Sequence, residues 1–218
     1  MLDIFNIFVV FLQDILTFFY NLTSSFGWAN YGAAIILLTI VIKMLLYPLT
    51  AKQVKSMKAM QELQPKMKAM QEKYKDNPEK LQKEMTAMYK ETGINPLAGC
   101  LPLIVQMPIL IGIFYAIRDY TYLNPPPQFF WIADLAKADT TYILPVLSAL
   151  TTYIQQKQTT TEVTQQTKMM MIFMPLFIGY ISITFPAGLV LYWVVSNLVQ
   201  IAQQWWMYRQ QEPKGEAA

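Results

Sequence analysis

The sequence lacks histidine altogether and contains one cysteine, Cys100. Without histidine there is no Ser-His pair for nucleophilic catalysis, and the most common zinc ligand after cysteine is missing. A lone cysteine cannot form an internal disulfide, so Cys100 is expected to be a small buried residue. No phosphate-binding loop occurs in the chain. The sequence therefore does not indicate an enzyme, and no cofactor or metal is expected.

Charged residues are also scarce. They make up 14% of the chain, whereas soluble domains carry about 25%, and 54% of the residues are hydrophobic. A transmembrane helix needs about 20 apolar residues, with about 17 at the short end. The stretches that meet or approach this length are residues 29–49, 97–117, 142–157, 169–185 and 188–208. The composition predicts an all-α polytopic membrane protein with five transmembrane helices.

Positive charge falls almost entirely on one side of these predicted spans. Residues 50–95 hold ten lysines against six acidic residues, and 14 of the 17 basic residues share that side if the spans alternate. The positive-inside rule makes this side cytoplasmic. The N-terminus is then outside, residues 118–141 form an outer loop, residues 158–168 a cytoplasmic loop, and residues 209–218 a cytoplasmic tail.

The N-terminal segment, residues 1–24, has neither a basic start nor a small-residue cleavage site, so it is not a signal peptide as it stands. Its polar residues recur near a 3.6-residue period, which predicts an amphipathic helix in the outer membrane interface. The alternative is a sixth span, against which Asp3 and Asp14 count. The polar residues are Asp3, Asn6, Gln13, Asp14, Thr17 and Asn21.

Residues 50–95 are predicted to form two helices separated near Asn77-Pro78, where asparagine can cap a helix and proline fits its first position. Apolar residues recur at spacings of three and four, which predicts a cytoplasmic antiparallel helical hairpin. Its methionines either hold the hairpin together or present an adaptable surface to a substrate or partner. They are Met57, Met60, Met67, Met70, Met85 and Met88.

One charge, Lys43, stands inside the first predicted span. A charged side chain at mid-membrane costs about 2.5–3.5 kcal/mol on insertion scales. Either Lys43 faces a polar cavity within the membrane, or its flexible stem lets the ammonium snorkel to the nearer interface.

Other polar side chains gather in the predicted cytoplasmic halves of the spans, whereas the outer halves are mostly apolar. This asymmetry predicts a hydrated recess around Lys43 that is open to the cytoplasm and closed to the outside. The alternative is that the polar groups join helices. The residues are Thr39, Gln106, Thr151, Thr152, Gln155, Gln156, Ser196, Asn197, Gln200, Gln203 and Gln204.

Several short motifs together resemble the YidC family of membrane protein insertases, from about residue 29 to residue 209. They are Tyr47-Pro48-Leu49-Thr50, Leu63-Gln64-Pro65-Lys66, Asn95-Pro96-Leu97-Ala98-Gly99-Cys100-Leu101-Pro102, Gln106-Met107-Pro108, Phe185-Pro186-Ala187-Gly188-Leu189-Val190-Leu191-Tyr192 and Ser196-Asn197-Leu198. The chain has the pattern of a short form, without a large outer domain before the first predicted span.

The resemblance implies a bacterial inner-membrane protein that inserts nascent membrane proteins through a positively charged groove. Such proteins act as monomers, alone or beside the Sec translocon, and some contact the ribosome. Lys43 takes the position of the family's groove arginine; it keeps the charge but loses the planar fork of donors. The resemblance places Thr39, Tyr192 and Trp193 near the substrate path. The resemblance also implies that the groove is lined by Gln106, Gln155, Gln156 and Asn197.

Two other classes of function stay open from the residues alone. A small channel or transporter could use Lys43 to select anions, although no inverted repeat is evident. A structural subunit of a membrane complex would account for the spans but not for the graded polarity.

Overall fold

The computed structural model describes residues 2–27, 29–93, 101–120, 128–160 and 165–211. Within these ranges the chain is all-helical, as predicted, apart from one isolated bridge between Phe129 and Ile132. The helices are α1 (Leu2–Ser25), α2 (Tyr31–Leu45), α3 (Tyr47–Lys73), α4 (Pro78–Thr92), α5 (Leu101–Arg118), α6 (Ile143–Thr159), α7 (Gln165–Ser182) and α8 (Ala187–Gln211). Cys100 and the motif residues 95–99 lie outside the described residues.

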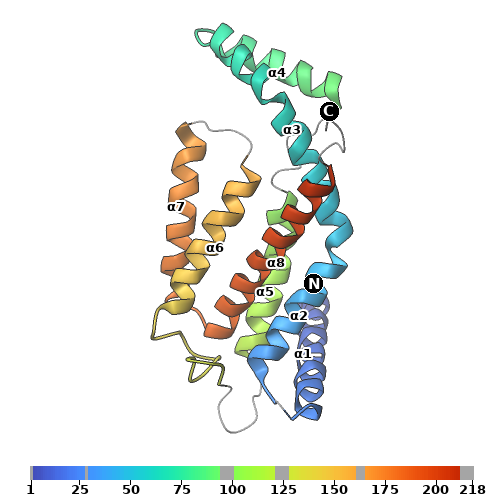
Figure 1. Ribbon diagram of the computed structural model, residues 1–218, viewed down its shortest axis with the longest axis vertical. Coiled ribbons are helices and arrows are strands. Elements are labelled where there is room, and N and C mark those ends of the chain that lie inside the picture. The colour runs from blue at the N-terminus through green and yellow to red at the C-terminus, as the bar shows by residue number, and fades with distance from the viewer. Residues whose placement is uncertain (1, 28, 94–100, 121–127, 161–164, 212–218) are drawn as a thin grey trace, which may run out of the picture.

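A bundle of six helices forms the body of the molecule, and α3 and α4 extend beyond one end of it (Figure 1). Helix α8 is central, because it packs against α2 on one side and α6 on the other, and α7 packs on α6. Close approach of α2 and α8 depends on small residues, since Ala34 and Ala187 are fully buried. A Cβ on Gly188 would lie 3.2 Å from the Ile35 side chain.

The end of the bundle opposite the hairpin is closed by the loop before α6. Phe129, Ile132 and Leu135 of this loop are buried in the same core cluster as α2, α5 and α8. The loop is fixed to the start of α8 by backbone hydrogen bonds, from the Gly188 amide to the Leu135 carbonyl (2.9 Å) and from Ala187 to Lys137 (2.7 Å). This end is therefore filled with apolar side chains.

Asp139 organises the same loop at the start of α6. Its carboxylate accepts hydrogen bonds from the Leu144 amide (2.8 Å) and from both the amide (3.0 Å) and hydroxyl (2.6 Å) of Thr141. Burial alone would raise the pKa of Asp139, but the hydrogen bonds from Thr141, Leu144 and Trp131 outweigh it and hold the pKa below its ordinary value. The ionised carboxylate thus stabilises the helix start.

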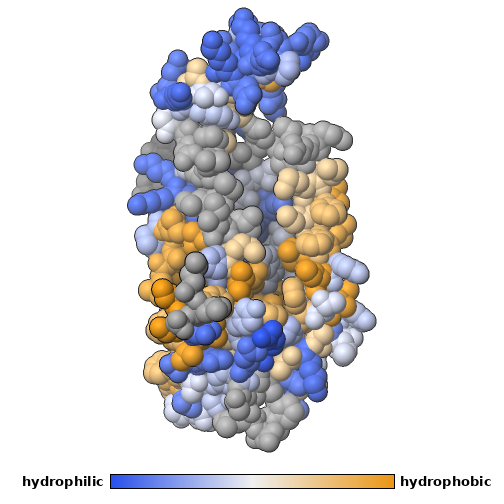
Figure 2. All heavy atoms as spheres, turned by 180° about the vertical axis from the view of Figure 1, so that it is seen from behind, coloured by the Kyte–Doolittle hydropathy of each residue, from blue (hydrophilic) through white to orange (hydrophobic). Residues whose placement is uncertain are grey.

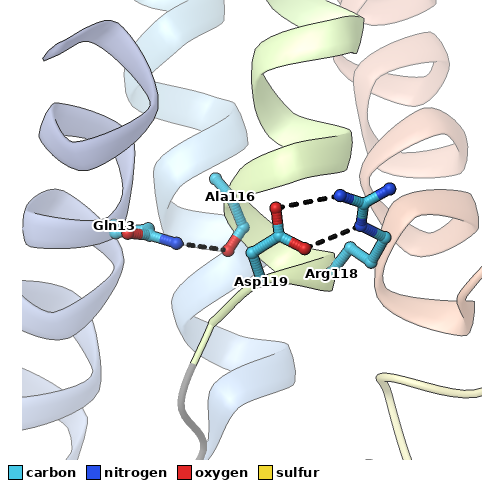
Figure 3. A network of polar contacts seen from close by, with 4 residues as sticks. All are labelled: Gln13, Ala116, Arg118 and Asp119. Carbon is cyan, nitrogen blue, oxygen red and sulfur yellow. Dashed lines mark hydrogen bonds and ion pairs between the residues drawn. The ribbon is translucent and has the colours of Figure 1, made fainter. Parts of the chain in front are cut away.

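Helix α1 lies lengthwise against α2 and α5. The Gln13 side chain donates to the Ala116 carbonyl at 3.3 Å, close to the Arg118–Asp119 pair at the end of α5 (Figure 3). Tyr20 stacks on Tyr31 with ring centroids 4.0 Å apart. The predicted polar face of this helix is therefore divided, since Gln13 binds α5 whereas Asp14 is exposed.

Apolar side chains cover much of the outside of the bundle. Figure 2 shows them as a band at mid-height, below the hydrophilic hairpin. On α7 the exposed residues include Ile172, Phe173, Leu176 and Tyr180. An apolar surface of this extent is typical of a protein surrounded by lipid.

Within the described residues, one helix is long and apolar enough on its own to cross a membrane, Ile4–Ser25 in α1, and the bent pair α2–α3 passes the same criterion together. The apolar helices Val105–Arg118 and Met169–Ser182 are shorter. Both the five-span count and the choice between interfacial helix and sixth span for α1 therefore stay predictions.

The first predicted span, residues 29–49, is bent in the structure. Helix α2 ends at Leu45, α3 begins at Tyr47, and their axes differ by 61°. Pro48 accounts for the bend, because proline has no amide hydrogen to donate to the carbonyl four residues earlier and its ring collides with that carbonyl. The hairpin helix therefore begins at Tyr47, earlier than the predicted residue 50.

Helices α3 and α4 pack on each other through Leu63, Met67 and Met88. The connection follows the capping chemistry expected from the sequence, since the Asn77 side chain accepts from the Lys80 amide at 3.0 Å and Pro78 starts α4. Gly93 ends α4 in the left-handed conformation, with φ of 66°, which glycine adopts without strain.

The Asp139→Asn variant should be less stable at neutral pH by about 1.5–3 kcal/mol, the usual contribution of hydrogen bonds to a buried charged group. Because the pKa of Asp139 is lowered in the folded state, its contribution is complete above the ordinary aspartate pKa of about 3.9 and is lost as the pH falls through the lowered value. Chemical unfolding in detergent, followed by circular dichroism, measures the difference at each pH.

The matched control is Asp119→Asn, because the Asp119 carboxylate is half exposed and, within the described ranges, bonds to its exposed neighbour Arg118 alone. This variant should unfold like the parent chain. Equal stabilities of the Asp139→Asn and parent proteins at pH 7 would contradict the assignment.

Candidate functional site

Lys43 lies in the last turn of α2 and is only 5% exposed. Its ammonium donates to the side-chain oxygen of Gln200 on α8 at 2.8 Å and, more weakly, to that of Gln106 on α5 at 3.5 Å. Within the described part of the chain no carboxylate pairs with it. The ammonium is thus held inside the bundle by neutral amides, which favours the polar cavity over snorkelling to the interface.

The contacts continue from Lys43 into the core. Gln106 uses its amide nitrogen to donate to the Tyr192 hydroxyl at 2.9 Å, and Ser196 also hydrogen-bonds this hydroxyl. Tyr192 is 1% exposed and Ser196 is 3% exposed. Gln106 therefore connects the lysine and the buried tyrosine, because its side-chain oxygen accepts from Lys43 and its nitrogen donates to Tyr192.

A pocket of about 300 Å³, including the space at its open mouth, lies beside Lys43. One wall comes from the bend and the first turns of α3, and the other from α5 and α8. The lining residues are Lys43, Leu46, Leu49, Thr50, Gln53, Val105, Gln106 and Gln200. The pocket combines one cation, hydrogen-bonding amides and apolar walls, a chemistry that suits a small anionic or polar group.

Trp193 and Asn197 belong to a different cluster, between α8 and α6. The Trp193 indole donates to the Thr152 hydroxyl at 3.0 Å, and the Asn197 amide donates to Thr152 at 3.0 Å and to Thr151 at 3.3 Å. These bonds join the two helices in the way that polar side chains do inside membranes. Trp193 and Asn197 are not brought to Lys43.

Three other predicted groove residues make no side-chain hydrogen bond to Lys43 among the described residues. Thr39 is fully buried, and its hydroxyl donates to the Ile35 carbonyl one turn earlier at 2.6 Å. Gln155 and Gln156 are half-buried near the end of α6. The structure therefore joins Lys43, Gln106, Tyr192, Ser196 and Gln200 of the predicted set.

The hairpin methionines are mostly covered. Met67 and Met88 are 2% and 8% exposed, and Met70 and Met85 pack against them. Met57 is also buried, and Met60 is half-buried. This burial favours the interpretation that they hold the hairpin together over that of an exposed adaptable surface.

The contribution of Thr50 and Gln53 to the site was not recognised from the sequence. Thr50 and Gln53 were assigned to the hairpin, yet they line the Lys43 pocket. The sequence carried a signal for Thr50, because in an unbroken helix residue 50 would share the face of Lys43, two turns earlier. Gln203, one of the polar residues predicted around Lys43, donates to the backbone carbonyl of Lys43 at 3.2 Å; the sequence does not indicate that its partner is the backbone. No group of metal-ligating side chains occurs in the described ranges.

The fold and the site define a class, an all-helical membrane protein with a hydrogen-bonded lysine buried between its helices. Residues 21–214 match the family described as "60Kd inner membrane protein". The chain belongs to this family.

Proteins similar to the chain bear one name. It is 46% identical to the membrane protein insertase YidC of Haemophilus influenzae strain KW20, over 89% of this chain and 40% of that protein. It is 43% identical to the protein of the same name from Francisella tularensis subsp. novicida, over 81% of this chain and 32% of the relative. The chain thus spans about two-fifths or less of the length of these relatives.

A solved structure described as "Active YidC insertase crystal structure with the first transmembrane domain resolved" superimposes with a TM-score of 0.72. It is 29% identical to the chain and covers 88% of it, whereas the chain covers 45% of that structure. The family predicted from the sequence motifs is confirmed.

The Lys43–Gln200 bond predicts a specific pattern of stability. Gln200→Leu should cost about 1.5–3 kcal/mol, because it leaves a buried ammonium with a single distant acceptor. Lys43→Met should cost less, and the double variant should cost little more than Lys43→Met alone. Thermal unfolding in detergent gives the coupling energy of this double-mutant cycle. Additive costs would contradict a direct bond.

Proposed function

We propose that the protein is a membrane protein insertase and chaperone. It draws the hydrophilic tail of a substrate protein into the polar site around Lys43 and releases the substrate's apolar helix into the bilayer. The observation that carries this proposal is the burial of Lys43 among amides, with no carboxylate partner in the described ranges. Membership of the family supports it.

The charge of Lys43 provides the attraction. An acidic residue that enters a bilayer loses its hydration at a cost of a few kcal/mol, and a hydrogen-bonded ammonium within the membrane offsets part of that cost. Gln106 and Gln200 already solvate the ammonium, so an arriving carboxylate replaces or joins them without leaving the lysine bare. The pocket thereby lowers the barrier for the polar part of the substrate.

The apolar part of the substrate provides the driving force. Burial of apolar surface stabilises by about 25 cal/mol per Å², so a spanning helix gains far more in lipid than its short tail loses. No nucleotide is required by this mechanism. The apolar walls of the pocket, Leu46, Leu49 and Val105, give the helix a surface to slide along toward lipid.

The orientation follows from the charge distribution. The lysine-rich hairpin is cytoplasmic, the apolar end closed by Phe129, Ile132 and Leu135 is outside, and the site is reached from the cytoplasm. The location is the bacterial inner membrane, with five spans, the N-terminus outside and the C-terminus in the cytoplasm. Function as a monomer, alone or beside a Sec translocon, and contact with the ribosome through the hairpin belong to the same proposal.

Reconstitution in liposomes tests the charge directly. A short single-span substrate with an acidic N-terminal tail should become protected from protease in liposomes that contain this protein alone. Lys43→Ala should reduce the protected fraction about tenfold or more, which corresponds to the loss of about 1.4 kcal/mol or more of attraction. Lys43→Arg should stay active, because it keeps the charge.

A substrate with a neutral tail serves as the control, and its insertion should depend much less on residue 43. Normal insertion of the acidic tail by Lys43→Ala would contradict the charge mechanism. Anion flux through the same vesicles, without insertion, would support the channel instead.

A further inference from the structure

The polar site and the hairpin meet at the bend between α2 and α3. Residues on both sides of this bend line the pocket. Lys43 and Leu46 lie before or at the bend, and Leu49, Thr50 and Gln53 follow it. Any change in the 61° angle between the two helices therefore changes the width of the pocket.

The bend is weak in its own backbone. Pro48 cannot donate to the carbonyl of Met44, so the bond that would continue the helix is missing. The first half of α3 lies beside the end of α8, where Gln61 is close to Tyr208, and its second half leaves the bundle (Figure 1). With 27 residues it is about 40 Å long, and a rotation of only 10° at the bend would move its far end by about 7 Å.

Helix α8 holds the residue just before the weak point at two places. Gln200 accepts from the Lys43 ammonium at 2.8 Å, and Gln203 donates to the Lys43 backbone carbonyl at 3.2 Å. The two glutamines are three residues apart and share a face of α8. The first contact fixes the charge, whereas the second fixes the last turn of α2 on which α3 depends.

The side-chain oxygen of Gln203, unlike its nitrogen, has no hydrogen-bond partner among the described residues. This oxygen is nevertheless buried. Buried amides usually satisfy both ends. The contact to Lys43 is thus the polar bond that holds this side chain in place, and it is an ordinary neutral bond of modest strength.

We propose that the Leu46–Pro48 bend is a hinge, and that Gln203 is the positioning residue that holds it closed over the Lys43 pocket. Displacement of the hairpin breaks the Gln203 contact and widens the pocket, so the orientation of the hairpin sets access to the lysine. This role rests on the proposed function for its purpose, but its geometry can be measured without any insertion assay.

The test compares the parent chain with Gln203→Met, which keeps the length of the side chain and removes its donor, and with Gln203→Ala, which cannot collide with its surroundings. Cys100→Ser removes the only cysteine, and a single cysteine is then placed at Gln53 in the pocket wall. Both Gln203 variants should increase the rate of its alkylation by a water-soluble maleimide about threefold or more.

A cysteine placed at Ser148 is the control for a general loss of packing in the bundle, because Ser148 is fully buried between α6 and α7 and bonds to Ser182. Its alkylation rate should not change. Spin labels at exposed positions, Lys75 in the hairpin and Leu150 on α6, should show a broader distance distribution in both Gln203 variants.

Unchanged alkylation at residue 53 would overturn the hinge, as would an equal rise at residues 53 and 148. Normal insertion by Lys43→Ala, together with faster alkylation at residue 53 in the Gln203 variants, would refute the proposed function and leave the hinge standing.

Discussion

The burial of one positive charge imposes the arrangement of the rest of the bundle. An ammonium buried inside a membrane protein has lost most of its hydrating water, which is costly. Protein dipoles must therefore solvate it. Lys43 obtains these dipoles from Gln200 on α8 and Gln106 on α5. Three helices must therefore converge at one depth, and the small residues Ala34 and Gly188, which let α2 and α8 approach closely, are part of the same requirement.

The two ends of the bundle meet different physical demands. At the end away from the hairpin the loop before α6 fills the bundle with apolar side chains and is fixed by Asp139 and the start of α8. Toward the hairpin, side chains such as Gln53 and Gln204 are buried although they are polar. Buried amides pack less favourably than hydrocarbon and are costly when half satisfied. The Lys43 pocket lies at this polar end.

Helix positions could be predicted from the sequence, whereas partners between helices could not. The apolar run at residues 188–208 corresponds to α8, and the Asn77 cap is seen as expected, because both depend on local chemistry. The pairing of Lys43 with Gln200, and of Trp193 with Thr152, depends on helix rotation and packing, which periodicity alone does not fix. Pro48 is a sequence signal for the bend, but the continuous apolar run at residues 29–49 suggested a single straight span. For α1, the period of the polar residues predicts a polar face of the helix. It does not predict whether that face contacts water, lipid or another helix.

In the proposed mechanism, the choice of lysine at this site has a consequence for release of the substrate. An ammonium has three donors; in the described ranges Gln200 takes one at 2.8 Å and Gln106 takes another at 3.5 Å. What is left for an arriving carboxylate is a single point contact, whereas an arginine would offer a planar, two-bond fork. A site through which groups pass must bind them strongly enough to admit them and weakly enough to let them leave. A lysine whose ammonium already has amide partners satisfies both conditions, because the amides still solvate the ammonium when the carboxylate departs.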